Sequence, residues 1–235
     1  MNEVVLSAGD TAWVLASSAL VLLMTPGLAF FYGGMVRAKS ALNMMMMSMI
    51  TIGIVSILWV IYGFAVAFGS SADSPWYGSI SLSGLGSAVN DLTNNGGIYP
   101  IPLLAFAAFQ LMFAIITPAL ISGAIADRTK FVSWALFVTI WVSIVYFPVA
   151  HWVFAFGNKV GDKITGAGFL AARGVEDFAG GTAVHINAGA AGLALAIVLG
   201  KRIGWQRSPM RPHSLPLVLL GAGLLWFGWF GFNAG

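Results

Sequence analysis

Long stretches without charged residues alternate with short polar joints along this chain. The charge-free stretches cover residues 11–36, 40–72, 92–126, 131–158, 178–200 and 212–235. About 20 apolar residues cross the hydrocarbon core of a bilayer as a helix, and a charge at its centre is costly. The pattern therefore predicts six transmembrane helices, at about residues 12–36, 41–68, 101–126, 131–156, 178–200 and 214–235.

The composition agrees with a protein whose surroundings are mostly lipid. Hydrophobic residues make up 59% of the 235 residues and charged residues only 8%, against about 45–50% and 25% in an ordinary soluble domain. So little charge excludes a soluble domain, a disordered chain and a nucleic-acid-binding protein. The chain has no cysteine, which excludes disulfides and thiolate chemistry. We expect an all-α fold, a polytopic transmembrane helix bundle.

The charges divide unequally between the two sides that alternate along six helices. One side holds a single acid, Asp127, and eight basic residues: Arg37, Lys39, Arg128, Lys130, Lys201, Arg202, Arg207 and Arg211. The other side holds three basic residues and seven acids: Lys159, Lys163, Arg173, Glu3, Asp10, Asp73, Asp91, Asp162, Glu176 and Asp177. Because basic loops stay in the cytoplasm, the first side is predicted to be cytoplasmic and the N-terminus external.

Asp177 directly precedes the fifth charge-free stretch. At that position its carboxylate can cap the helix by accepting the backbone N–H groups of Ala179 or Gly180, and its charge complements the helix dipole. A cation ligand is the functional alternative for the same side chain. We favour the cap, because one carboxylate alone is a weak signal for a cation site.

His185 follows Asp177 by eight residues within the same predicted helix. At about 1.5 Å per residue it would lie roughly 12 Å below the cap, near the middle of the membrane. Desolvation disfavours an imidazolium there, so we expect a neutral ring with one donor and one acceptor nitrogen. Such a ring can pass on a small polar molecule; the alternative is a hydrogen bond between packed helices.

Metal binding and enzyme activity have little support. His185 has no histidine, cysteine or carboxylate three or four residues away, as a helical metal site would have. His151 is interpreted as structural, and His213 lies in a predicted cytoplasmic loop. The sequence shows no phosphate loop, nucleophile triad or paired catalytic carboxylates. We therefore expect no metal, no cofactor and no enzymatic reaction.

Aromatic and small residues supply two further patterns. Phe109 and Phe113 share a helix face, four residues apart, and Trp152, Phe154 and Phe156 lie near a helix end. They are interpreted as core packing or an interfacial belt, with a cation-π cage as the functional alternative. Ala188, Gly192 and Ala196, with Gly189 beside them, form a small-residue ladder that predicts a close helix contact.

Several motifs in a fixed order resemble the ammonium transporter family, the Amt/Mep proteins related to the Rh proteins. The resemblance runs from about residue 12 to the last residue. It is carried by Asp177 to Asn187 with the following Ala188 to Leu193, and by the segments Pro26-Gly27, Phe31 to Gly34, Phe109-Gln110 with Phe113, Gly123-Ala124, Asp127-Arg128 and Gly228 to Gly235.

The resemblance implies roles for individual residues. Phe109 and Phe113 are similar to the residues of the family's external ammonium recruitment site, and Phe113 with Phe232 as its stacked partner to the phenylalanine gate of the pore. Asp177 is similar to the essential aspartate below the recruitment site, and His185 to the first of two pore histidines. Phe154 occupies the position where the family often has a tryptophan, a stronger cation-π partner.

The resemblance also implies a longer protein. Family members have about eleven helices in two inverted halves, so residues 1–235 would be the N-terminal portion of the ammonium transporter domain: the first half plus one helix. The second half, with the second pore histidine, is absent from this chain. A pore lined by both halves cannot be closed by one, so we expect a fragment; a half-pore with one histidine is the alternative.

The function implied is membrane transport of ammonium in a plasma membrane. Ammonium, or methylammonium as its analogue, would be held by the outer aromatics, lose its proton and pass as ammonia by His185. A neutral-gas channel of the Rh type and an ammonium sensor are the alternatives. The resemblance also implies a homotrimer and a PII-type signal protein that docks on the cytoplasmic face.

Overall fold

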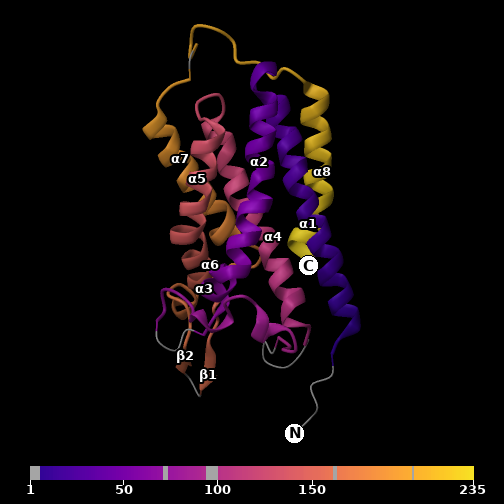
Figure 1. Cartoon of the computed structure of the whole chain (residues 1–235), viewed down its shortest axis with the longest axis vertical. Helices are drawn as coiled ribbons and strands as arrows, with labels where there is room; N and C mark the ends of the chain where they lie inside the picture. The colour runs from indigo at the N-terminus through magenta and orange to yellow at the C-terminus, as the bar shows by residue number, and fades with distance from the viewer. Residues whose placement is uncertain (1–5, 71–73, 94–99, 161–162, 203) are drawn as a thin grey trace.

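Long helical segments run side by side through the bundle (Figure 1). In the computed structural model, residues 6–70, 74–93, 100–160, 163–202 and 204–235 are described. Within those ranges, six segments are long and apolar enough to cross a membrane. They are Ala8–Met35, Ala38–Phe68, Leu103–Ile125, Phe131–Phe154, Gly181–Leu199 and Leu215–Ala234. The all-α transmembrane bundle is therefore confirmed.

The described residues contain eight α-helices, because two of the six segments are each divided into two helices by a π-helical turn. The helices are α1 (Ala8–Met35), α2 (Ala38–Leu58), α3 (Phe64–Phe68), α4 (Leu103–Ile121), α5 (Phe131–Trp141), α6 (Phe147–Phe154), α7 (Asn187–Leu199) and α8 (Leu215–Ala234). Short 3-10 turns cover Ile80–Leu82, Gly86–Ala88, Ser122–Ile125 and Ala171–Arg173. An antiparallel pair of three-residue strands, β1 (Asn158–Val160) and β2 (Lys163–Thr165), lies between α6 and α7. The sequence analysis did not predict this hairpin.

Three segment starts differ from the expected ones by three or four residues; one is that of the second segment, which begins at Ala38 and not at residue 41. The first helix begins at Ala8, where the Ser7 hydroxyl accepts the Asp10 N–H at 3.3 Å, and not at residue 12. The fifth segment begins at Gly181, and not at residue 178, because Gly180 has a left-handed backbone with φ of 84°. A chain in that conformation cannot continue a right-handed helix, so the expected start at 178 is wrong.

π-Helical turns interrupt three of the six segments. They cover Trp59–Gly63 between α2 and α3, Val142–Tyr146 between α5 and α6, and Gly181–Ile186 before α7. The first two turns meet, since the Tyr62 and Ser143 hydroxyls lie 2.6 Å apart. Single π-turns inside helices often occur at functional sites; here the third carries His185.

The core of the bundle consists of large rings whose polar atoms have partners. Trp59 and Trp134 are almost completely buried. The Trp59 indole N–H donates to the Ala107 carbonyl at 3.0 Å, and that of Trp134 donates to the Met47 carbonyl at 2.7 Å. These bonds join the turn Trp59–Gly63 to α4, and α5 to α2, and they remove the cost of burying an indole N–H away from water.

The closest helix contact joins α1 to α8 through glycines. A Cβ atom added to Gly221 would lie 2.3 Å from the Phe31 nitrogen and 2.6 Å from the Gly27 oxygen. Gly228 and Gly231 meet α1 equally closely. The small-residue ladder on α7 is looser: a Cβ on Gly192 would meet Ala124 at 3.3 Å, and one on Gly189 would meet nothing within 4 Å.

The alternating helices define two ends of the bundle. At the Asp177 end, α1 and α4 begin and α6 and α8 finish; at the Arg37 end, α1 meets α2, α4 meets α5, and α7 is joined to α8. In Figure 1 the Arg37 end is at the top, and α7 and α8 lie on opposite sides of the bundle there. Glu3, Asp73 and Asp162, counted in the charge asymmetry, lie outside the described residues.

Candidate functional site

Four rings from three segments follow one another toward the interior from the Asp177 end. Phe109 and Phe113 of α4 lie 4.8 Å apart between ring centroids, and Phe113 lies 4.7 Å from Phe232 of α8. Phe232 in turn lies 5.6 Å from the imidazole of His185. The structure therefore brings together four of the residues that the sequence analysis selected.

The stacking partner of Phe232 differs from the expected one. The planes of Phe113 and Phe232 are inclined by 67°, an edge-to-face contact, so the expectation that these two rings stack is wrong. Phe232 stacks on His185, with an interplanar angle of 12°. The physical reason is that Phe113 approaches Phe232 from another helix than His185 does, so it presents a different angle to the ring, and the imidazole covers one face of Phe232. Edge-to-face phenyl pairs are as favourable as offset-stacked ones.

The Asp177 carboxylate caps the fifth segment, although through other residues than expected. Oδ1 accepts the N–H of Gly181 at 2.6 Å, and Oδ2 accepts those of Thr182 and Ala183 at 2.9 Å each. The expected donors, Ala179 and Gly180, are wrong because they belong to the turn before the helix. The side chain is 8% exposed. Both carboxylate oxygens therefore hold backbone groups, which fixes where the His185 segment starts.

His185 is the fifth residue of its segment, Gly181–Ile186 being the π-helical turn. Its ring is exposed on the described chain and lines a groove of about 420 Å³ together with Trp229, Phe232 and Asn233. In Figure 1, α7 and α8 lie on opposite sides of the bundle toward the Arg37 end. The imidazole is therefore free to contact a small molecule.

Two cavities adjoin the line of rings at the Asp177 end. The smaller, about 160 Å³, is lined by Phe109, Phe113, Phe154 and Phe232 among others. The larger, about 440 Å³, is lined by Phe106, Phe154 and Asp177 among others. Phe154 faces both, and its ring stacks on Phe68 at 6.3 Å.

Sequence reasoning gave no role to three residues of this region. Gln110 lines both cavities, Phe178 lines both cavities and the groove, and Trp229 lies 6.3 Å from the His185 ring. Phe178 is 92% exposed. The spacing in the sequence could have indicated Trp229, because it is three residues before Phe232 and therefore lies on the same helix face. None distinguished Phe178 from the other aromatic residues.

The residues interpreted as structural lie away from the line of rings. His151 is completely buried, and its Nδ1 donates to the Ala67 carbonyl at 3.1 Å. The Trp152 indole N–H donates to the Trp76 carbonyl at 2.8 Å, so this ring does not replace Phe154 in the cavities. Among the described residues, no three His, Asp or Glu side chains come together as a metal site would require.

The arrangement suits passage of a small, uncharged polar molecule. Aromatic edges and faces line the approach, and a single imidazole with nitrogen donor and acceptor follows. Six spans and this apolar approach define a multi-pass helical membrane protein. Over residues 12–235, the sequence matches the Ammonium Transporter Family, and the chain belongs to that family.

Known relatives agree with this assignment. An ammonium transporter of Mycobacterium tuberculosis is 57% identical over 97% of this chain and 50% of its own length, and Amt1 of Archaeoglobus fulgidus is 45% identical over 98% and 53%. The crystal structure of Saccharomyces cerevisiae Mep2 matches with a TM-score of 0.83 and 31% identity over 98% of this chain and 50% of that one. The chain spans about half the length of the curated relatives it matches.

Proposed function

We propose that the protein containing this chain transports ammonium across a membrane. The observation that carries the proposal is the line of rings from Phe109 through Phe113 and Phe232 to the His185 imidazole. The family and the names of the relatives, which are ammonium transporters, support the substrate. In this proposal Phe109, Phe113, Phe154 and Asp177 form the recruitment region, Phe113 and Phe232 the gate, and His185 the pore histidine.

The mechanism follows from the cost of desolvation. Moving a bare cation into an apolar channel costs tens of kcal/mol by idealised continuum arithmetic, whereas neutral ammonia avoids most of that cost. Ammonium is held outside the gate by the negative faces of the phenyl rings, worth about 2 kcal/mol when dry. It transfers its proton there to water of the outer solution, and ammonia passes the Phe113 and Phe232 edges. The imidazole then offers ammonia a hydrogen-bond partner.

Asp177 acts indirectly in this proposal. Its oxygens accept three backbone N–H groups, so it positions the turn that carries His185 and does not need to touch the substrate. Its carboxylate also adds negative charge beside the larger cavity, which favours a cation there over an anion.

The same proposal includes the orientation of the chain in the membrane, the assembly of the protein and a second half of the transporter. The Arg37 end carries the basic residues and is assigned to the cytoplasm, with the N-terminus outside a plasma membrane. A second half that closes the groove beside His185, a homotrimer and a PII-type partner on the cytoplasmic face remain predictions from the family resemblance.

Uptake of labelled methylammonium by the complete transporter in proteoliposomes tests the scheme. We expect His185→Ala and Phe113→Ala to change flux or selectivity strongly. Phe227→Ala is the matched control, because Phe227 is on the same helix as Phe232 and does not line the cavities and groove described above. Unchanged flux and selectivity in both His185→Ala and Phe113→Ala would contradict the proposal.

An ammonium sensor is the second candidate. A solved structure titled "Sensor Amt Protein" matches with a TM-score of 0.80 and 29% identity over 95% of this chain and 53% of that one. Ammonium binding without measurable flux in the complete protein would favour a sensor. Currents and competition by potassium separate an ammonium transporter from a neutral-gas channel of the Rh type.

A further inference from the structure

A separate cavity of about 80 Å³ lies at the Arg37 end, far from the line of rings. It is formed by the joint between α1 and α2, the joint after α4, and the segment between α7 and α8. Its polar lining comprises Arg37, Arg202, Arg211, Asp127 and Ser208, and Met35 and Met210 contribute to its apolar side. None of these residues belongs to the line of rings from Phe109 to His185 that we propose for transport.

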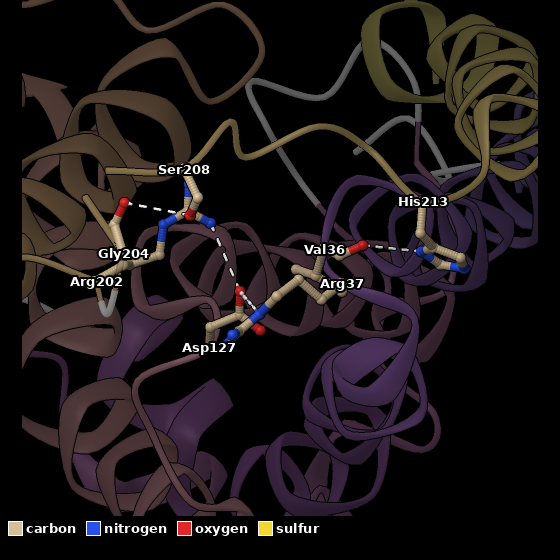
Figure 2. Close-up of polar contacts among 7 residues, drawn as sticks. All are labelled: Val36, Arg37, Asp127, Arg202, Gly204, Ser208 and His213. Carbon is tan, nitrogen blue, oxygen red and sulfur yellow. Dashed lines mark hydrogen bonds and ion pairs between the residues drawn. The ribbon is translucent and has the colours of Figure 1, made fainter. Parts of the chain in front are cut away.

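Positive charge exceeds negative charge in this cavity. Three arginines and a single acidic residue line it, and the guanidinium groups of two of them, Arg37 and Arg202, lie beside the Asp127 carboxylate. Figure 2 shows Arg37 and Arg202 reaching Asp127 from two different segments. The Arg37 Nε lies 3.2 Å from Asp127 Oδ2, and Arg202 Nη1 lies 3.8 Å from the same oxygen. One carboxylate oxygen therefore serves two arginines, and the charge of one carboxylate cannot neutralise three guanidinium groups.

Most donors of these arginines remain available. A guanidinium has five N–H groups, and Asp127 receives one hydrogen bond from Arg37, while the 3.8 Å contact with Arg202 is an ion pair without a hydrogen bond. Arg211 forms no ion pair with a carboxylate among the described residues. Asp127 Oδ1 is buried and accepts no hydrogen bond from the part of the chain described, so the carboxylate uses few of the donors beside it.

The start of α2 adds to the positive potential. α2 begins at Ala38, directly after the lining residues Val36 and Arg37, and its 21 residues end at Leu58. Its N-cap residue is Arg37, whose side chain makes no capping hydrogen bond. The first backbone N–H groups of a helix lack partners within the helix and favour an anion nearby.

We infer that this cavity is a binding site for a phosphate oxyanion. Guanidinium forks match the geometry of phosphate oxygens and bind them in pairs, and three arginines with an uncapped helix start provide the complementary charge. The Ser208 hydroxyl also lines the cavity; it donates to the Gly204 carbonyl at 3.5 Å (Figure 2) and would have to turn away from that carbonyl to donate to the anion. The group belongs either to soluble phosphate or to the headgroup of an anionic lipid, for which Met35 and Met210 would provide an apolar rim.

Asp127 has a defined part in this site. It holds Arg37 and Arg202 beside the cavity but also competes with the anion for them. Asp127 has φ of 62°, a backbone conformation that asparagine tolerates well. Asp127→Asn keeps the shape and removes the competing charge, so it should bind the anion more tightly.

Equilibrium binding to the complete protein in neutral detergent tests the inference, with radiolabelled inorganic phosphate as the probe and chloride to match ionic strength. We expect Arg202→Gln and Arg211→Gln each to lower the affinity roughly tenfold, the loss of one charge-assisted pair. Arg207→Gln is the matched control: it lies in the same segment, is exposed and does not line the cavity. Asp127→Asn should raise the affinity several-fold.

A second arm identifies the source of the phosphate group. Native mass spectrometry counts phosphatidylglycerol against phosphatidylcholine bound to the same variants. If the protein binds no inorganic phosphate but Arg211→Gln loses bound phosphatidylglycerol, the ligand is a lipid headgroup. If the protein binds phosphate but shows no preference for phosphatidylglycerol, the ligand is a soluble anion. Either result supports the site. The inference would be overturned if phosphate bound no more strongly than chloride and the protein showed no preference for phosphatidylglycerol over phosphatidylcholine. It would also be overturned if Arg207→Gln lost as much phosphate affinity as Arg202→Gln and Arg211→Gln. The same holds if Asp127→Asn bound phosphate more weakly while its thermal midpoint stayed unchanged.

Discussion

The two ends of the bundle hold their polar residues by different means. At the Asp177 end, a carboxylate that is 8% exposed accepts three backbone N–H groups and is surrounded by aromatic rings. At the Arg37 end, the Asp127 side chain is 6% exposed, but its partners are long side chains, Arg37 at 46% and Arg202 at 30% exposed. Both carboxylates are therefore buried, and the difference lies in their partners: backbone N–H groups at one end, and arginines that water and salt can reach at the other.

This difference separates a rigid end from an adjustable one. A buried carboxylate that accepts three backbone N–H groups holds the start of a helix in place. Partly exposed ion pairs contribute little free energy and rearrange easily when another ion arrives. The rigid end therefore suits a gate whose rings must keep their separation, and the adjustable end suits a site that responds to an anion.

The largest effect is expected where the two ends are linked, along the glycine contact of α1 with α8. Gly221→Ala would place a methyl group 2.3 Å from the Phe31 nitrogen, and backbone atoms cannot move aside as a flexible side chain can. We expect the free energy of unfolding of the complete protein to fall by about 3 kcal/mol. Thermal unfolding in detergent measures it.

Gly223→Ala is the matched control for that prediction, because a Cβ at Gly223 meets nothing within 4 Å among the described residues. It should leave stability unchanged or slightly raised, by up to about 1 kcal/mol, since alanine favours helix more than glycine. Equal losses in the two variants would show that close packing of α1 on α8 does not hold the ends together.

An intermediate effect is expected at the Asp177 end alone. Asp177→Ala leaves the N–H groups of Gly181, Thr182 and Ala183 without their acceptor, which should cost about 2 kcal/mol. Hydrogen exchange should speed up in residues 181–186 and stay unchanged in residues 123–130. Asp177→Asn, which retains one acceptor oxygen, should lose less. Faster exchange at both ends would refute the separation.

The smallest effect is expected at the Arg37 end. Arg37→Gln removes a partly exposed ion pair and should change the free energy of unfolding by only about 0.5 kcal/mol. The change should shrink further as salt is raised, because salt screens exposed charges. Thermal midpoints at low and high salt measure it; the Asp177→Ala loss should not depend on salt. A salt-independent loss in Arg37→Gln would mean that its pair with Asp127 is shielded as well.

Much of the fold followed from local pattern. Runs of apolar residues between charged joints predicted six spans, and six segments of that kind are present. His185 stood out because it is a polar residue within such a run, and Phe109 with Phe113 because their spacing places both on one face. These inferences depend only on residue type and helical period, which a single sequence contains.

Other features depended on contacts between distant segments. Contacts between different helices bring Phe232 and Trp229 next to the His185 ring. They also bring Gly221 close to Phe31. The Asp177 donors were also misjudged, because the left-handed Gly180 delays the helix start. Local pattern cannot predict which glycine in a membrane helix meets a partner and which faces open space.

The sequence by itself determined which parts of the chain avoid water and which residues within them are costly enough to require a reason. That result follows from transfer free energies, which each residue carries with it. How those residues meet follows from the packing of the helices: four rings lie in line from α4 and α8 to His185, and three arginines and one aspartate line a single cavity. Such meetings depend on how helices pack, and packing is set by the shapes of many side chains together.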